Sequence, residues 1–221
     1  MSHSLQFRRP VIASLLLATA SASHAHGKQT SQDEYTLYEL FAPETASFKI
    51  TYEVTATTTG AEAFFNPIRK GSVASDEAVF DMATGAPLKF EQVSGAKAKE
   101  TGLPDADLAS DYIRVRLARP VPGDGGQARL RIIKTYKDAK SYRREGDGIV
   151  FDRPLGIRRN AVVLPAGFQL TECNVPSQIL PEPDGRTRIS FMHQAPGPAA
   201  LILKAKPGRY DRRPWHATVP D

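Results

Sequence analysis

The strongest constraint on the fold of this chain is an alternation of apolar and polar side chains over residues 46–58. Phe48, Ile50, Tyr52 and Val54 occupy every second position, and the residues between them are lysine, threonine and glutamate. Successive side chains of a β-strand point to opposite faces, so this period of two predicts a strand with one buried face. The threonines near the end of the segment favour a strand over a helix, because β-branched side chains lose rotamer freedom in a helix.

Shorter segments with the same alternation recur along the chain, and turn residues separate them about every 8–12 residues. No helical pattern recurs. We therefore predict an all-β fold, an antiparallel β-sandwich of many short strands with one loop or short-helix excursion near residues 95–110. The sandwich domain is expected over residues 46–206, and a division into two small domains near residues 141–148 is the alternative.

Three pairs of neighbouring segments are predicted to form hairpins, because turn residues separate two runs of alternating side chains. The Asp184-Gly185 dipeptide is a strong hairpin signal, since both residues tolerate the backbone angles of a tight turn. The three pairs are residues 72–82 with 87–93, residues 111–118 with 127–136, and residues 177–180 with 186–192.

The first 25 residues have the features of a cleaved signal peptide. Arg8 and Arg9 precede an apolar run over residues 11–20, and small residues then offer cleavage sites after Ala22 or Ala25. The run is too short to span a bilayer, which takes roughly 20 residues, and no later apolar run is long enough. We expect residues 1–25 to be removed, which predicts a periplasmic or secreted protein with no membrane span.

The two ends of the remaining chain are predicted to lie outside the sandwich. Residues 26–45 are expected to form a flexible lead-in and a first short strand. Residues 207–221 are basic and proline-rich and are expected to form a tail.

Charge and cysteine content exclude two further features. The net charge of +5 falls to +3 once Arg8 and Arg9 are removed, and residues of both signs are interspersed. Because no basic stripe or nucleic-acid motif is present, nucleic acid is not expected as a partner. Cys173 is the only cysteine, so no internal disulfide can form, and we expect a buried structural thiol there.

Five arginines and a tyrosine gather in residues 142–160. Guanidinium groups bind carboxylate, sulfate or phosphate through two parallel hydrogen bonds, so the expected partner is a small anionic ligand or a partner protein. The alternative is internal ion pairing with Glu145, Asp147 and Asp152, which would leave only a solvated rim. The candidate ligand-binding residues are Tyr142, Arg143, Arg144, Arg153, Arg158 and Arg159.

His26 suggests a different kind of site. If cleavage follows Ala25, His26 becomes the first residue, and its amine and imidazole together form a chelate suited to copper, with His193 as a further ligand. This arrangement resembles the N-terminal histidine brace of exported copper proteins, which include oxidative polysaccharide monooxygenases. The alternative is that His26 is only a residue at the end of the signal peptide, and no cofactor is then expected.

A proline–glycine turn, a strand, an asparagine and an Asp-Gly turn follow one another in the last third of the chain. They are Leu164-Pro165-Ala166-Gly167-Phe168, Cys173-Asn174-Val175-Pro176 and Asp184-Gly185, followed by a strand with Phe191. This order, over residues 47–206, resembles the N-terminal β-sandwich of aminopeptidase N-type zinc peptidases. The resemblance implies an open sandwich. It implies no peptidase activity, because the zinc-binding H-E-x-x-H motif is absent.

These observations predict an exported, non-catalytic β-sandwich that serves as a binding or accessory module. The nucleophile motif G-x-S-x-G is also absent from the sequence. Two alternatives stay open. One is a copper-binding protein or oxidase with an N-terminal histidine, and the other is a sandwich-type hydrolase or lyase whose residues the sequence does not reveal.

Overall fold

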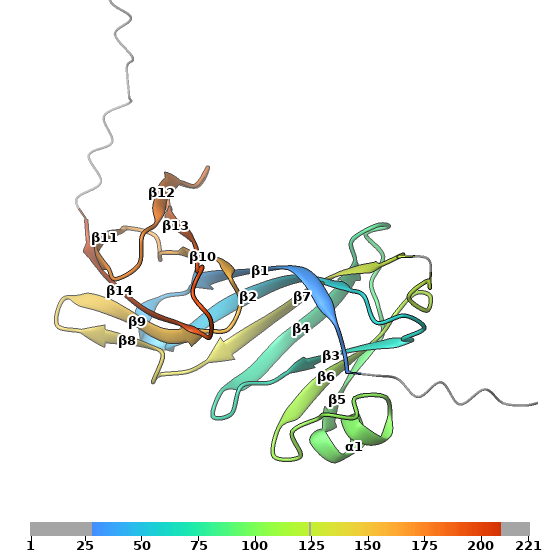
Figure 1. Ribbon diagram of the computed structural model, residues 1–221. Helices are drawn as coiled ribbons and strands as arrows, with labels where there is room; N and C mark the ends of the chain where they lie inside the picture. The colour runs from blue at the N-terminus through green and yellow to red at the C-terminus, as the bar shows by residue number, and fades with distance from the viewer. Residues whose placement is uncertain (1–27, 124, 209–221) are drawn as a thin grey trace, which may run out of the picture.

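The computed structural model describes residues 28–123 and 125–208, and this part of the chain consists mainly of β-strands (Figure 1). Its helical elements are α1, Gly95–Glu100, and a 3-10 turn, Pro43–Thr45. None of its helices is long and apolar enough to cross a membrane. The strands are β1 (Ser31–Leu40), β2 (Ser47–Ala56), β3 (Ala63–Pro67), β4 (Val73–Asp81), β5 (Phe90–Ser94), β6 (Asp111–Arg116), β7 (Ala128–Lys137), β8 (Tyr142–Glu145), β9 (Gly148–Leu155), β10 (Arg159–Val163), β11 (Phe168–Cys173), β12 (Gln178–Pro181), β13 (Thr187–Met192) and β14 (Ala199–Pro207).

Seven of these strands form a large sheet in the order β12-β13-β10-β1-β2-β7-β4. β1 lies at its centre, where it pairs antiparallel with β2 and parallel with β10. β1 begins at Ser31 and has ten residues, so it is longer than the short strand expected from the sequence. Its backbone groups are satisfied from both sides, which is what a central strand requires.

Two smaller sheets pack against one face of the large sheet (Figure 1). One has the strand order β11-β14-β9-β8 and the other β3-β6-β5. The inward side chains of β2 belong to two separate cores: Phe48 and Ile50 pack with the four-stranded sheet, and Tyr52 and Val54 pack with the three-stranded sheet. One sheet therefore carries two partners side by side, which leaves a junction over its middle.

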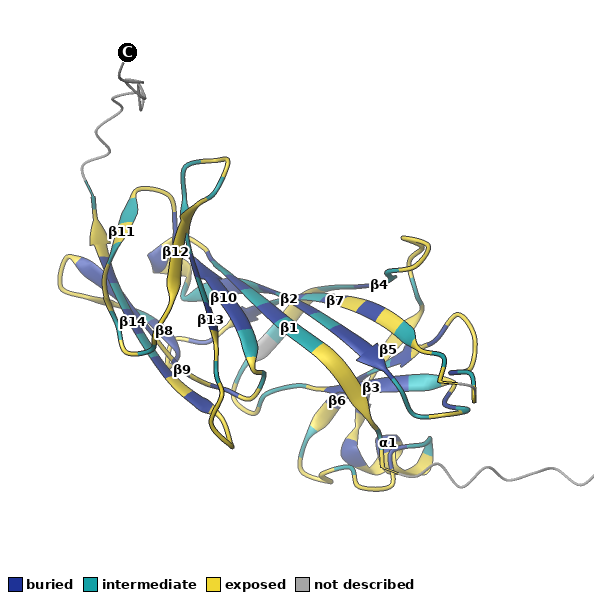
Figure 2. Ribbon diagram, turned by 45° about the horizontal axis from the view of Figure 1, so that its top comes forward, coloured by how far each residue is buried: buried dark blue, intermediate teal, exposed yellow. Residues whose placement is uncertain are grey.

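The fold class predicted from the sequence is confirmed. The strand expected over residues 46–58 is β2, and its alternating apolar side chains are at most 7% exposed (Figure 2). The hairpin around Asp184-Gly185 joins β12 to β13, and the excursion near residues 95–110 contains α1. Burial of apolar surface at about 25 cal/mol per Å² is the main term that holds such alternating strands in the core.

The other two predicted hairpins are wrong, and for the same reason. β4 meets the chain ahead of β5 only at a bridge between Phe80 and Pro87, because β4 then pairs with β7 and β5 pairs with β6. Likewise, β6 and β7 do not pair, because β6 lies between β3 and β5 whereas β7 lies between β2 and β4. At both turns the chain crosses from one sheet to another, so a turn that looks like a hairpin turn joins two layers.

Gly95 is the glycine whose replacement tests the packing of α1. A Cβ atom there would overlap the carbonyl oxygen of Asp107 and lie 2.7 Å from the Cα atom of Leu108. Both are backbone atoms, which cannot move aside cheaply. We expect Gly95→Ala to lower the free energy of unfolding by about 1–3 kcal/mol, as overpacking does, measured by urea denaturation. Gly156→Ala is the matched control, because nothing lies within 4 Å of its added Cβ, and an equal loss in that variant would contradict the prediction.

Candidate functional site

A cavity of about 270 Å³ lies at the junction of the three sheets. Its walls come from β1, β2 and β7 of the large sheet, from β3 of the three-stranded sheet, and from β9 of the four-stranded sheet. The lining residues are Gln29, Ser31, Glu34, Thr36, Tyr38, Ile50, Tyr52, Phe64, Phe65, Asn66, Pro67, Arg69, Lys134, Tyr136, Arg153 and Ile157.

Lys134 is a buried cation in the wall of this cavity. It lies on β7 on the same face as Ile132 and Tyr136, opposite Ile50 of β2, and is only 4% exposed. Its Nζ atom donates a hydrogen bond of 2.6 Å to Oδ1 of Asn66 and lies 5.1 Å from the centre of the Tyr136 ring. Among the described residues no carboxylate forms an ion pair with it.

The surroundings of Lys134 disfavour its charged form. Burial is the larger cause and repulsion from Arg153 the second, and together they lower the pKa of Lys134 from 10.5 to about 8. Glu77 opposes this shift only as the last of the three contributions. Near neutral pH this amine is therefore close to its titration range, which a solvent-exposed lysine is not.

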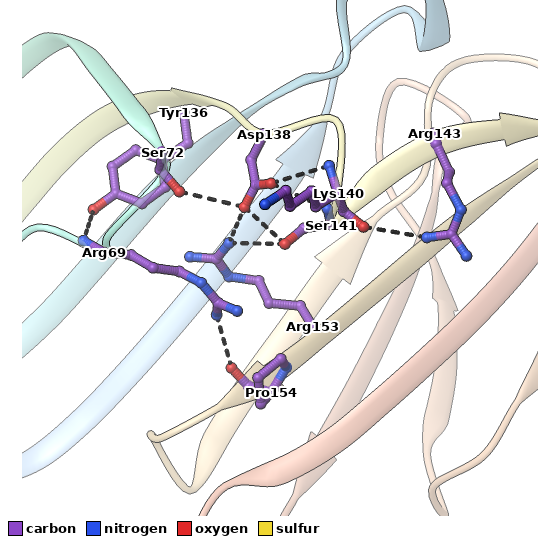
Figure 3. A network of polar contacts seen from close by, with 9 residues as sticks. All are labelled: Arg69, Ser72, Tyr136, Asp138, Lys140, Ser141, Arg143, Arg153 and Pro154. Atoms are coloured by element: carbon purple, nitrogen blue, oxygen red, sulfur yellow. Dashed lines mark hydrogen bonds and ion pairs between the residues drawn. The ribbon is translucent and has the colours of Figure 1, made fainter.

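Arg153 enters the junction from β9 and is held by a buried ion pair (Figure 3). Its Nη1 atom lies 3.0 Å from Oδ2 of Asp138, and the two side chains are 6% and 8% exposed. Asp138 also accepts hydrogen bonds from the hydroxyl groups of Ser72 and Ser141 and from the backbone N–H groups of Lys140 and Ser141. The guanidinium group lies 5.2–5.8 Å from the ring centres of three aromatic residues, Tyr38, Phe48 and Tyr136.

The pKa of Asp138 shows that the ionised form of this carboxylate is favoured in the ion pair. Burial alone would raise that pKa, but hydrogen bonds from Ser141 and then the charge of Arg153 outweigh it and hold the pKa below its usual 3.8. Asp138 is therefore ionised at neutral pH and neutralises Arg153. The pair anchors β9 of the four-stranded sheet to the chain that follows β7.

Arg69 brings a third cation to the cavity from the loop that connects β3 to β4. Its backbone N–H donates to the hydroxyl oxygen of Tyr136, and its Nη1 atom donates to the carbonyl oxygen of Pro154, each at 3.2 Å (Figure 3). Burial, followed by repulsion from Arg153, lowers the pKa of Arg69. These contacts hold the guanidinium group between two sheets with N–H groups to spare, since arginine has five.

The carboxylate in the cavity wall is that of Glu34, and it is engaged by neighbours. The hydroxyl of Tyr52 donates to its Oε1 atom at 2.6 Å, and that of Ser31 donates to the same atom at 3.1 Å. Asp138 neutralises the charge of Arg153. The charges that remain in the cavity wall are two cations, Lys134 and Arg69, and one carboxylate, Glu34. The described lining therefore carries a net positive charge, which suits a small anion.

The structure does not bring the five predicted arginines together. Three of them lie beside carboxylates on the surface: Arg143 is 4.0 Å from Asp152, Arg144 contacts Glu44, and Arg159 is 4.0 Å from Asp33. Arg153 alone points into the cavity. Arg158 is exposed, and it lines a second depression of about 470 Å³ together with Arg159, so the structure does bring these two arginines together. Tyr142 is wholly buried, and its hydroxyl donates to the carbonyl of Phe41 at 2.8 Å. Ligand binding by the surface arginines stays a prediction.

The predicted copper ligands and the cysteine lie apart from the cavity. His26 falls outside the described residues. His193 is half-buried, its backbone N–H donates to the carbonyl of Arg158, and its Nε2 atom has no hydrogen-bond partner in the described part of the chain. Cys173 is half-buried and packs against the core under the four-stranded sheet. Copper binding by His26 and His193 therefore stays a prediction.

Sequence reasoning missed Lys134, Asn66 and Arg69. One signal was present: in residues 127–136 the inward positions carry leucine, isoleucine, lysine and tyrosine, so one lysine occupies an apolar register. A charged residue is almost never fully buried without a reason. For Asn66 and Arg69 no comparable signal exists, because their strand and loop reach the large sheet only through the crossing between layers.

The fold and the cavity define an open all-β sandwich with a cationic pocket at the junction of its three sheets. No protein-family model matches this chain, and no curated protein matches it. Among solved structures, an M1 zinc metallopeptidase from Deinococcus radiodurans has this fold: the TM-score is 0.51 and the identity 14%, over 81% of this chain and 42% of that one. A mutant of the same enzyme bound to a Tyr-Ser-Ala substrate gives a TM-score of 0.50 at the same identity and coverage. A two-domain M1 zinc metallopeptidase mutant bound to L-arginine also gives 0.50.

These likenesses confirm, for the fold, the predicted resemblance to the β domain of this peptidase family. The chain spans about two fifths of the length of the enzymes it matches. The residues present do not fit the zinc ion of those enzymes, because the sequence has no H-E-x-x-H motif and the described residues contain no cluster of three histidine, cysteine or acidic side chains.

Proposed function

We propose that this protein is an exported, non-catalytic β-sandwich module that binds a small anionic ligand in the cavity at the junction of its three sheets. The observation that carries the proposal is Lys134, a buried cation with an amide partner and no ion-paired carboxylate among the described residues. A buried charge without a counter-charge is costly, and a bound anion would supply one.

The size and lining of the cavity limit the chemical class of ligand that it can bind. A volume of about 270 Å³ is small, and apolar side chains such as Ile50, Phe64 and Ile157 share the wall with the cations. Pockets of this kind bind through apolar contact and take their specificity from a few polar groups. The preferred ligand is a small carboxylate with a short apolar part, held by Lys134 and Arg69.

The accessory role and the export of the protein have separate support. The fold is shared with about two fifths of the length of an M1 zinc metallopeptidase chain, while the sequence lacks the H-E-x-x-H motif that binds zinc. The arginine pair, the apolar run and the small residues of positions 8–25 support export through a cleaved signal peptide. Mass spectrometry of the mature N-terminus tests this part, and a chain that keeps Met1 when expressed in its own cell would refute it.

The binding proposal predicts that acetate or benzoate raises the melting temperature, because a ligand that binds only the folded state stabilises it by RT ln(1 + [L]/Kd). At a ligand concentration of 100 times Kd the gain is about 2.7 kcal/mol. Calorimetric titration should give one site per chain. Arg69→Met is expected to weaken binding by roughly tenfold or more, because a hydrogen bond to a charged group contributes about 1.5–3 kcal/mol.

Arg129→Met is the matched control for this experiment. Arg129 also lies near the junction strands, on β7, but faces the opposite side of the sheet and pairs with Glu53 at 3.7 Å. It should bind the same carboxylates with unchanged affinity. Equal weakening in both variants would mean that only overall charge matters, and unchanged binding in Arg69→Met would exclude the cavity as the site.

A further inference from the structure

We infer that the Lys134 amine captures the carbonyl group of a small oxo-acid, that is, an aldehyde or ketone that also carries a carboxylate, as a covalent imine. This inference rests on the proposed function, because the carboxylate of the oxo-acid is the anion that the cavity binds. It adds a second chemical requirement, a reactive carbonyl within reach of Nζ, and it makes Lys134 a nucleophile as well as a charge.

The geometry around Nζ is that of a reactive amine. Lys134 lines the cavity, the residue is only 4% exposed, and Nζ donates a hydrogen bond of 2.6 Å to the neutral amide oxygen of Asn66. A carboxylate at that place would hold the proton on the amine, whereas an amide holds it only weakly. When one N–H of the neutral amine points to Asn66, the lone pair is left free to face the cavity.

Among the charges near Lys134, Arg153 disfavours the ammonium form, and Glu77 of β4 opposes this effect only as the last of the three contributions to the pKa. Arg153 comes from β9 and Arg69 from the loop after β3, while Glu34 of β1 is bonded by two hydroxyl groups. Burial and Arg153 lower the pKa of Lys134 to about 8. At pH 7 its neutral fraction therefore exceeds that of an exposed lysine by on the order of 100-fold. Desolvation beside another cation is a known way to activate a lysine toward carbonyl compounds.

The step balances without an oxidant or reductant. The lone pair of Nζ attacks the carbonyl carbon, the C=O π bond breaks, and a proton passes from nitrogen to oxygen to give a carbinolamine. The hydroxyl group then leaves with a proton as water, and the C=N bond forms. Hydrolysis reverses the step, so the capture is reversible and one water is released for each imine.

Arg69 would position the ligand for this step. Its guanidinium group can bind the carboxylate of the oxo-acid through two hydrogen bonds. This contact would fix the orientation of the ligand, with its carbonyl carbon toward the amine. Ile50, Phe64 and Ile157 line the same space and offer apolar contact to the rest of the ligand. A neutral aldehyde lacks the carboxylate and should be captured less well.

Reductive trapping tests the inference on the whole protein. The folded chain is treated with glyoxylate and cyanoborohydride at pH 7, and peptide mapping then measures which lysines carry a carboxymethyl group. Lys134 is expected to be labelled at least about tenfold faster than Lys99, an exposed lysine of α1, because of its larger neutral fraction. Acetate in excess should protect Lys134 and leave Lys99 unaffected. Labelling of Lys134 at or below the rate of Lys99 would overturn the inference.

Two further experiments distinguish failure of imine formation from failure of the proposed anion binding. Lys134→Arg keeps the charge and should still bind acetate by calorimetry, while Lys134 labelling is lost by definition and no other lysine gains it. In the wild-type chain, replacing glyoxylate by acetaldehyde should slow Lys134 labelling by roughly tenfold, the effect expected from losing a charged hydrogen bond. Acetate binding without selective labelling overturns the imine and leaves the binding proposal intact, whereas no acetate binding to the wild-type chain overturns both.

Discussion

Replacing Asp138 by alanine is expected to lower the free energy of unfolding by about 3–5 kcal/mol, because it leaves Arg153 as a buried charge without its partner. The pair is 3.0 Å apart and both side chains are less than one-tenth exposed. The loss should depend on pH. The folded-state pKa of Asp138 is lowered, so its contribution is present above about pH 4 and disappears as the pH falls through the folded-state value. Urea denaturation at pH 7 and at acid pH measures both effects.

Two variants show whether the loss comes from the buried charge. Asp152→Ala removes an exposed carboxylate 4.0 Å from Arg143 and should cost less than about 1 kcal/mol, as surface pairs do. Combining Asp138→Ala with Arg153→Met removes the orphaned charge and should restore about 2 kcal/mol. A double variant no more stable than Asp138→Ala alone would show that the serine hydrogen bonds to Asp138, and not the arginine, carry the effect.

Replacing Lys134 by methionine is expected to stabilise the protein at pH 7 by about 1–3 kcal/mol. The pKa of Lys134 falls from 10.5 in the unfolded chain to about 8 in the folded one, so the folded state holds a disfavoured ammonium group at neutral pH, which corresponds to about 3 kcal/mol. Methionine fills a similar volume without that charge. Asn66 would lose its partner, but its amide faces the cavity, where water can take over.

The pH profile gives the sharper measurement. Between pH 8 and 10.5 the unfolded chain binds the lysine proton and the folded chain does not, so wild-type stability should rise with pH through that window. Up to pH 9.5 the rise from this residue is about 2 kcal/mol. The comparison stops there because burial raises the pKa of Tyr38, Tyr52 and Tyr136, which makes stability fall once tyrosines of the unfolded chain ionise near pH 10.

Lys134→Met should lack this rise, and Lys49→Met should keep it. Lys49 lies on the neighbouring strand β2 but faces the opposite side of the sheet, where it pairs with Glu39 at 2.5 Å. A Lys134→Met variant less stable than wild type at pH 7 would mean that the ammonium group is compensated in the folded state. Such a result would also remove the main support for an anion in the cavity.

The wrongly predicted β4–β5 and β6–β7 pairings show that local sequence patterns do not predict which strands are neighbours in a sheet. The turn at Asp184-Gly185 was predicted correctly because the two strands that it joins pair with each other and remain in one sheet. The segments before and after residues 117–127 alternate just as cleanly, yet β6 and β7 belong to different sheets. Alternation reports that a segment has a buried face. It does not report which layer that face meets.

The same limit applies to the site. The arginines of residues 142–160 are neighbours in sequence, but they do not meet at one site: Arg153 alone lines the cavity, and Arg158 and Arg159 line a separate depression. Lys134, Asn66 and Arg69 are far apart in sequence and meet only because two small sheets share one face of the large sheet. Proximity along the chain was therefore a poor guide to proximity in space.

The amino-acid order alone determined the all-β class, the strand β2, the β12–β13 hairpin and the short helix α1, because each depends on side chains a few residues apart. Tertiary structure alone decided that two sheets dock side by side on a third and that a lysine lies buried between them. The physical reason is the distance along the chain over which the interactions act. Strand patterns and turns are set by local sterics and burial, whereas the electrostatic environment of Lys134 is created by residues from five strands that approach one another only when the layers pack.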